Sequence, residues 1–234
     1  RSEVAVAELG CAPIRDRTRP RVLLGGLGLG YTLRATLDSL PKNAIVVQAE
    51  LNPAVVDWCR GPLAVLTNDA LADPRVIVHV GDVTDLIRRS ADEGQPFDAI
   101  IVDLYEGPGH VPPGRPDPLF GARILEVTAR ALSAGGVYAV WGEKKAPEFE
   151  ARLKRLGFTV RLVQNHRGQR HPVYVAERGE KVLTPSPRAP QQAPSGPAAH
   201  ASSARRPRAS AAPGGPAGRA RPGRSSSASK PRKR

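Results

Sequence analysis

The sequence is poor in several residue types that would point to particular classes of protein. Its 234 residues include no methionine, two cysteines and only 4% aromatic residues. Cys11 and Cys59 stand far apart and form no C-x-x-C pair, so we expect two ordinary reduced thiols. No apolar run approaches the roughly 18 residues of a membrane span, and no signal-peptide pattern opens the chain. These absences predict a cytoplasmic protein with no membrane partner.

Acidic and aromatic residues are missing altogether from residue 184 onward. That stretch holds 11 of the 35 Lys and Arg residues and 10 of the 24 prolines, so the net charge of +13 belongs mainly to it. Its few apolar side chains cannot offset chain entropy, which predicts one domain over residues 1–183 and a disordered basic tail over 184–234. Without aromatic side chains the tail offers nucleic acid only weak, nonspecific phosphate attraction.

The segment 22–34, VLLGGLGLGYTLR, is the most informative stretch of the chain. An apolar run meets several glycines and then a helix-compatible segment, which indicates a strand, a tight turn and a helix. The dinucleotide fingerprint G-x-G-x-x-G fails, because its third glycine would fall on a tyrosine or a leucine. The spacing Gly26-x-Gly28-x-Gly30 is associated with nucleosides that lack a pyrophosphate, such as S-adenosylmethionine. A purely structural turn is the alternative.

Alternating apolar segments predict the fold. The predicted strands cover 21–25, 44–49, 75–80, 97–102, 137–141, 158–163 and 172–176. The predicted helices cover 31–40, 54–66, 84–91, 119–132 and 146–156, and residues 3–12 fit either type. The first five strands alternate with helices and are almost continuously apolar, which indicates a parallel sheet buried on both faces. The last two strands have no helix between them, so we predict an α/β, Rossmann-like, mostly parallel seven-stranded sheet with an antiparallel last strand.

Acidic residues stand at the carboxyl ends of the predicted strands, where ligands of such sheets bind. Glu50 could accept hydrogen bonds from both hydroxyls of a ribose, or be a solvated acid. Asp82 could accept from the amine of an adenine while the Val83 amide donates to a ring nitrogen, or it could cap a helix, and these roles can coexist. Asp103 and Glu106 could bind a cationic substrate and remove its proton, or cap a loop.

Other chemistries have no signal in the sequence. No His, Cys or carboxylate cluster has metal-ligand spacing, so we predict no metal. There is no G-x-S-x-G and no Walker loop. Residues 103–106, DLYE, do not match the Asn/Asp-Pro-Pro-Tyr/Phe stretch expected of enzymes that methylate amino groups of nucleic acids.

Taken together, these segments resemble the spermidine synthase family, the polyamine aminopropyltransferases, over residues from about 20 to 140 and more weakly to about 175. The similar segments are VLLGGLGLGYTLR at 22–34, AELNP at 49–53, DPRV at 73–76 leading to GD at 81–82, FDAIIVD at 97–103, and LF at 119–120 with GGV at 135–137. The resemblance implies a class I methyltransferase fold, a homodimer and a small cationic polyamine substrate.

The resemblance also implies a role for each acid. Glu50 would hold the ribose of decarboxylated S-adenosylmethionine, Asp82 its adenine, and Asp103 would deprotonate the attacking amine. Three departures stand out. The family's motif aspartate, implied to bind the donor's amine, is Leu29, and its second loop aspartate is Glu106. The amino-terminal segment that supplies further substrate-binding residues does not occur in the given sequence, either because it was cut off or because this is a divergent relative.

Three functions follow as hypotheses. The first is a spermidine-synthase-like transferase that moves an aminopropyl group from decarboxylated S-adenosylmethionine to a polyamine. The second is a methyltransferase that uses S-adenosylmethionine itself, favoured by Leu29 and by the glycine spacing. The third is a non-catalytic, nucleic-acid-associated protein that acts through its tail.

Overall fold

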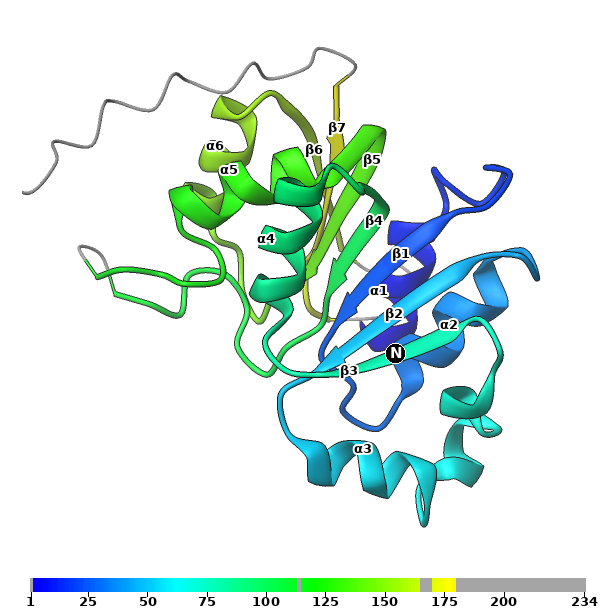
Figure 1. The fold of residues 1–234 in the computed structure, drawn as a ribbon. Helices are drawn as coiled ribbons and strands as arrows, with labels where there is room; N and C mark the ends of the chain where they lie inside the picture. The colour runs from blue at the N-terminus through cyan, green and yellow to red at the C-terminus, as the bar shows by residue number, and fades with distance from the viewer. Residues whose placement is uncertain (1, 113–114, 165–169, 180–234) are drawn as a thin grey trace, which may run out of the picture. The chain divides into compact units, whose positions relative to one another are not determined.

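A computed structural model describes residues 2–112, 115–164 and 170–179, which lie in one structural unit, Arg1–Ser186. Figure 1 shows a central twisted sheet between two layers of helices. The strands are β1 Arg21–Gly25, β2 Ile45–Glu50, β3 Val76–Val80, β4 Phe97–Val102, β5 Leu132–Trp141, β6 Phe158–Val163 and β7 Val173–Arg178. The helices are α1 Ser2–Cys11, α2 Tyr31–Ser39, α3 Pro53–Arg60, α4 Val83–Glu93, α5 Ala122–Ala131 and α6 Pro147–Arg155, with short 3₁₀ turns at Ala64–Thr67 and Ala70–Ala72.

The strand order is β3-β2-β1-β4-β5-β7-β6. The first five strands pair in parallel, whereas β7 pairs antiparallel with both β5 and β6. The predicted α/β class and the antiparallel last strand are therefore confirmed. The order reverses between β1 and β4, and this reversal is the point at which open α/β sheets leave a crevice for ligands.

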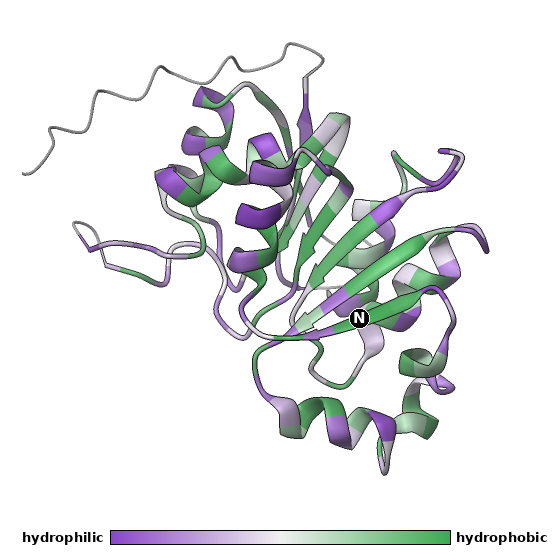
Figure 2. Cartoon of the chain, in the orientation of Figure 1, coloured by the Kyte–Doolittle hydropathy of each residue, from purple (hydrophilic) through white to green (hydrophobic). Residues whose placement is uncertain are grey.

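The core has two halves because successive strand residues point to opposite faces. On β1, Leu23 packs into the cluster beneath α4, α5 and α6, while Leu24 packs into the cluster beneath α1 and α2. Ile100 and Ile101 on β4 divide in the same way. Figure 2 shows hydrophobic strands at the centre and hydrophilic residues on the outer sides of the helices. The double burial explains why the central strands β1, β2 and β4 are almost continuously apolar.

Two predicted helix boundaries are wrong. The helix predicted at 54–66 ends at Arg60, because Gly61 is followed by Pro62, which cannot donate the next helical hydrogen bond. The helix predicted at 119–132 begins only at Ala122, because the Asp117 side chain accepts from the amides before it and forms a turn. Both errors lie in connections and leave the order of the elements unchanged.

Residues 3–12, which the sequence leaves undecided, form helix α1. Gly10 lets this helix approach the sheet closely, since a Cβ there would lie 2.9 Å from the side chains of Ala139 and Ile101. Among the described residues, no helix combines the length and the apolar character needed to cross a membrane. The tail predicted to be disordered, 184–234, lies outside the described residues, and its disorder stays a prediction.

Candidate active site

The glycine loop after β1 adopts the backbone angles that its composition predicts. Gly26, Gly28 and Gly30 have φ of +90°, +52° and +83°, a region that side chains other than glycine rarely enter. A Cβ on Gly26 would lie 2.3 Å from the carbonyl oxygen of Asp103, so the loop packs directly on the segment that follows β4. Glycine is required there by close contact as well as by conformation.

The tip of β2 holds this loop in place. The Glu50 carboxylate accepts from the Leu27 amide at 2.9 Å through Oε2 and from the Asn52 amide at 2.8 Å through Oε1. The buried side chain of Gln48 donates from Nε2 to the Gly26 carbonyl at 2.9 Å. Each Glu50 oxygen keeps a second lone pair, so these contacts leave the carboxylate able to accept from a ligand.

A hollow of about 220 Å³ brings together four of the residues expected to bind the donor. Gly26, Glu50, Asp82 and Val83 all line it, with apolar walls that include Leu104. Asp82 also caps α4, since its Oδ1 accepts from the Thr84 amide at 2.8 Å. The capping role is therefore present, and the same residue still faces the hollow.

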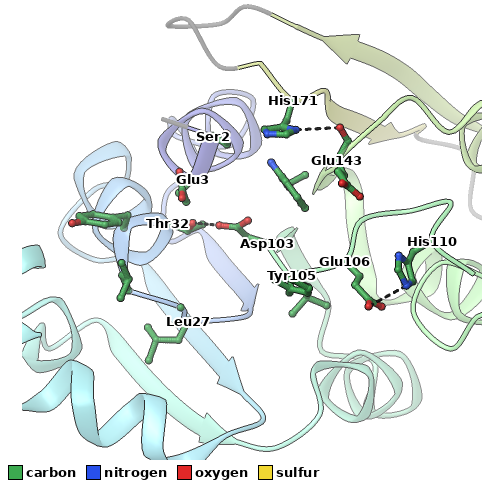
Figure 3. A pocket seen from close by; sticks show the side chains of 15 residues that line it. Ser2, Glu3, Leu27, Thr32, Asp103, Tyr105, Glu106, His110, Glu143 and His171 are labelled. Carbon is green, nitrogen blue, oxygen red and sulfur yellow. Dashed lines mark hydrogen bonds and ion pairs between the residues drawn. The ribbon is translucent and has the colours of Figure 1, made fainter.

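A larger cavity of about 770 Å³ lies beside the first, and Leu104 lines both. Asp103 and Glu106 face this larger cavity (Figure 3), and Gly28 also lines it. Gly30 lines neither hollow. Gly30 is the residue before α2, and a Cβ added to it would lie 3.2 Å from the Thr67 side chain. Of the six residues predicted to bind the donor, four therefore line the smaller hollow, Gly28 lines the larger one and Gly30 lines neither. Their roles in binding stay a prediction.

Asp103 is the most deeply buried acid of the larger cavity. Its Oδ2 accepts a hydrogen bond from the Thr32 hydroxyl, and its amide donates to the Gly25 carbonyl at 2.9 Å. Burial raises the pKa of the Asp103 carboxyl, the Thr32 bond opposes that rise, and the nearby charge of Glu3 adds to it. A carboxylate with a raised pKa is a better proton acceptor than an exposed one.

Several lining residues of this cavity were not predicted. Glu3 comes from α1, Trp141 ends β5, Glu143 follows it, and His171 precedes β7. The Trp141 and His171 rings lie 5.3 Å apart, and the His171 Nδ1 is 3.1 Å from the Glu143 carbonyl. The strand-end rule could have found Trp141 and Glu143, since both lie at the carboxyl end of β5.

The residue types around the cavity define its charge. Among the residues that the structure describes, its lining includes four carboxylates, Glu3, Asp103, Glu106 and Glu143, and no lysine or arginine. Glu106 pairs with His110, whose Nε2 lies 3.1 Å from its Oε1, and both side chains are about half exposed. An acidic hollow of this kind suits a cationic ligand.

Comparison with known proteins identifies the family. The sequence model of the spermine/spermidine synthase domain matches residues 13–156. The chain belongs to this family. A polyamine aminopropyltransferase of Mycobacterium tuberculosis is 35% identical over 127 residues, which are 54% of this chain and 23% of the relative. One of Clostridium tetani is 29% identical over 132 residues, 56% of this chain and 44% of the relative. The chain therefore spans less than half the length of these relatives.

Solved structures share the fold. The spermidine synthase of Thermotoga maritima is 21% identical with a TM-score of 0.53, over 76% of this chain and 61% of that one. Human methyltransferase-like protein 13 in complex with SAH is 20% identical with a TM-score of 0.58, over 78% and 83% of the two chains. At these identities the likeness concerns the fold alone, and it confirms the methyltransferase-like class.

Two residues at which the resemblance implies an aspartate line the acidic cavity. Leu29 lies there at the glycine loop with a half-exposed side chain. Glu106 has a side chain one methylene longer than an aspartate. The described residues contain no group of three His, Cys or carboxylate side chains placed to hold a metal ion.

Proposed function

We propose that the chain transfers an aminopropyl group from decarboxylated S-adenosylmethionine to an amine of a polyamine. The smaller hollow holds the adenosine, with Glu50 at the ribose and with Asp82 and the Val83 amide at the adenine. The larger cavity holds the acceptor, and its carboxylates favour a cation. The observation that carries the proposal is the partly buried Asp103 in an acidic cavity that adjoins the hollow of Glu50 and Asp82.

The chemistry asked of Asp103 is the removal of one proton. A free alkylamine has a pKa of about 10, so at neutral pH its nitrogen lone pair is blocked by a proton. Asp103 takes that proton, and the freed lone pair attacks the carbon next to the sulfonium. The new N–C bond forms as the C–S bond breaks, and the bonding pair leaves with sulfur, which becomes a neutral thioether. Alignment of the two reactants supplies much of the rate.

Product analysis tests the proposal directly. The chain is incubated with putrescine or spermidine and with either the decarboxylated or the carboxylated donor, and the products are identified by mass spectrometry. We expect an aminopropylated amine from the decarboxylated donor only. Asp103→Asn should abolish transfer while leaving donor affinity, measured by calorimetry, within a few-fold. Asp85→Asn on the outer surface of α4 is the matched control and should change neither.

A large loss of donor affinity in Asp103→Asn would contradict its assignment as the base. Failure of the wild-type chain to transfer with every amine tried would contradict the proposal itself.

A second function is favoured by the glycine spacing and, more specifically, by the leucine at position 29. An aliphatic side chain cannot anchor the ammonium group of a decarboxylated donor. The second candidate is therefore a methyltransferase that takes intact S-adenosylmethionine. Calorimetry with the two donors separates the candidates, since tighter binding of the carboxylated donor would favour methyl transfer. Leu29→Asp should then shift the preference toward the decarboxylated donor in either case.

A further inference from the structure

We propose that Thr32 is a positioning residue for Asp103. Its hydroxyl fixes Oδ2 of the Asp103 carboxylate and leaves Oδ1 as the atom that accepts the proton. This inference rests on the proposed function, because it assigns how the proposed base is held. It concerns a residue that faces the same cavity from a different element, the first turn of α2.

The contact itself is well defined. The Thr32 side chain is almost fully buried, with 3% exposure, and its hydroxyl donates to Oδ2 of Asp103 (Figure 3). Threonine is β-branched, so its χ1 has few alternatives and the hydroxyl has little freedom to leave the carboxylate. Asp103 is fixed from the other side by its amide, which donates to the Gly25 carbonyl at 2.9 Å. The carboxylate is therefore anchored both through its backbone and at one oxygen.

The same contact sets which charge state is favoured. The Thr32 hydroxyl donates to Asp103, and a donor of this kind stabilises the ionised carboxylate. Thr32 lies in the first turn of α2, and the amino-terminal end of a helix carries partial positive charge, which favours a nearby anion. Gly30 at the N-cap has no side chain that could satisfy the first-turn amides. Burial acts in the opposite direction and raises the pKa of Asp103.

A general base needs both effects, the rise in pKa caused by burial and the stabilisation of the ionised form by Thr32. Without Thr32, burial would raise the pKa of Asp103 further and leave less of the ionised carboxylate that accepts a proton. Full exposure would leave it ionised but weakly basic. With Oδ2 occupied by the hydroxyl, Oδ1 is the oxygen available to the amine, and its direction is set by the plane of the anchored carboxylate. Thr32 directly follows the glycine loop in sequence, and its hydrogen bond to Asp103 connects this loop to the acceptor cavity.

The experiment compares Thr32→Val, which keeps the shape and removes the hydroxyl, with Thr32→Ser, which keeps the hydroxyl. The pKa of Asp103 is read by carbon-13 NMR titration of its carboxyl group in the whole chain without substrate. We expect a higher pKa in Thr32→Val and a value close to wild type in Thr32→Ser. In turnover, the acid limb of the pH profile should move to higher pH in Thr32→Val. Its kcat should fall about tenfold or more, with KM for the amine nearly unchanged.

Thr36→Val is the matched control, because Thr36 is also a buried threonine, lies one turn further along α2 and does not line the cavity. It should alter neither the titration nor the pH profile. An unchanged pKa of Asp103 in folded Thr32→Val overturns the inference, and so does a Thr32→Ser chain that titrates like Thr32→Val. If Thr32→Val fails to fold, Thr32→Ser decides alone, since loss of kcat with an intact hydroxyl contradicts positioning. The titration needs no turnover, so it gives its answer even if the proposed transfer fails.

Discussion

The Glu50 carboxylate and the Leu27 amide lie 2.9 Å apart, so the tip of β2 directly holds the glycine loop of β1. A second amide, that of Asn52, binds the other oxygen of the same side chain. Glu50→Gln keeps one acceptor oxygen, which can bind only one of these two backbone amides. The other backbone amide then faces the NH₂ group of the glutamine and loses its hydrogen-bond acceptor. We expect donor affinity to fall about tenfold or more, because hydrogen bonds to a charged group are worth about 1.5–3 kcal/mol.

Calorimetry with each donor measures this loss. Glu126→Gln, on the outer side of α5, is the control and should bind both donors as the wild type does. Unchanged affinity in Glu50→Gln would mean that the ribose lies elsewhere.

Two glycines of the loop should respond differently to the same substitution. An alanine at Gly26 would place its Cβ 2.3 Å from a backbone oxygen of Asp103, whereas a Cβ on Gly28 meets nothing within 4 Å. Gly28→Ala therefore costs only the left-handed conformation, about 1–2 kcal/mol. Gly26→Ala must also displace the backbone of Asp103, so it should lower the free energy of unfolding clearly more than Gly28→Ala does. Urea unfolding of the two variants tests this, and equal losses would contradict the described packing.

Glu3 should influence Asp103 through charge. Burial is the main cause of the raised pKa of Asp103, and the negative charge of Glu3 adds to it. Glu3→Gln removes that contribution, so the pKa of Asp103 should fall and the acid limb of the pH profile should move to lower pH. The cavity also loses one of its carboxylates, which should raise KM for a cationic amine. A pH profile that moves in the opposite direction would show that Glu3 does not act on Asp103 by repulsion.

An ion pair far from the cavity should stabilise the fold in a pH-dependent way. Hydrogen bonds from Arg75 lower the pKa of Asp73 from 3.8 to about 2. Arg75 also donates to the carbonyls of Leu37 at 2.8 Å and Leu40 at 3.1 Å, which ties the start of β3 to the end of α2. The lowered pKa of Asp73 stabilises the folded state at any pH above the pKa that this carboxyl has in the unfolded chain. This stabilisation is lost as the pH falls toward its pKa in the folded chain.

Asp73→Asn should therefore reduce the free energy of unfolding by about 1–2 kcal/mol at neutral pH. The difference from wild type should shrink as the pH falls from about 4 toward 2. Urea unfolding over this range measures it, and a difference that grows in acid would reverse the assigned sign.

The sequence predicted the sheet well because its central strands are buried on both faces. A nearly continuous apolar run such as 97–102, where Asp98 is the one charged residue, favours a buried strand because it is short and an acid follows it. Helix α1 escaped prediction for a related reason. Its buried residues, among them Val6, Ala7 and Leu9, surround the helix almost completely, so its apolar pattern has no helical period.

Part of the candidate site was predictable and part was not. Glu50, Asp82 and Asp103 follow from the rule that parallel strands present their carboxyl ends at one edge. Glu3 and His171 lie on segments outside the parallel strands, so only the three-dimensional packing brings them to the cavity. The hydrogen bond between Thr32 and Asp103 spans 71 positions of the chain, and no local pattern announces it.

Leu104 forms part of the wall of both hollows. In the proposed reaction, the sulfonium carbon of the donor in the smaller hollow and the amine in the larger cavity would meet beside this aliphatic side chain, which offers no hydrogen bond to water. Keeping water away from the reacting carbon would disfavour hydrolysis of the donor, a side reaction that competes with transfer.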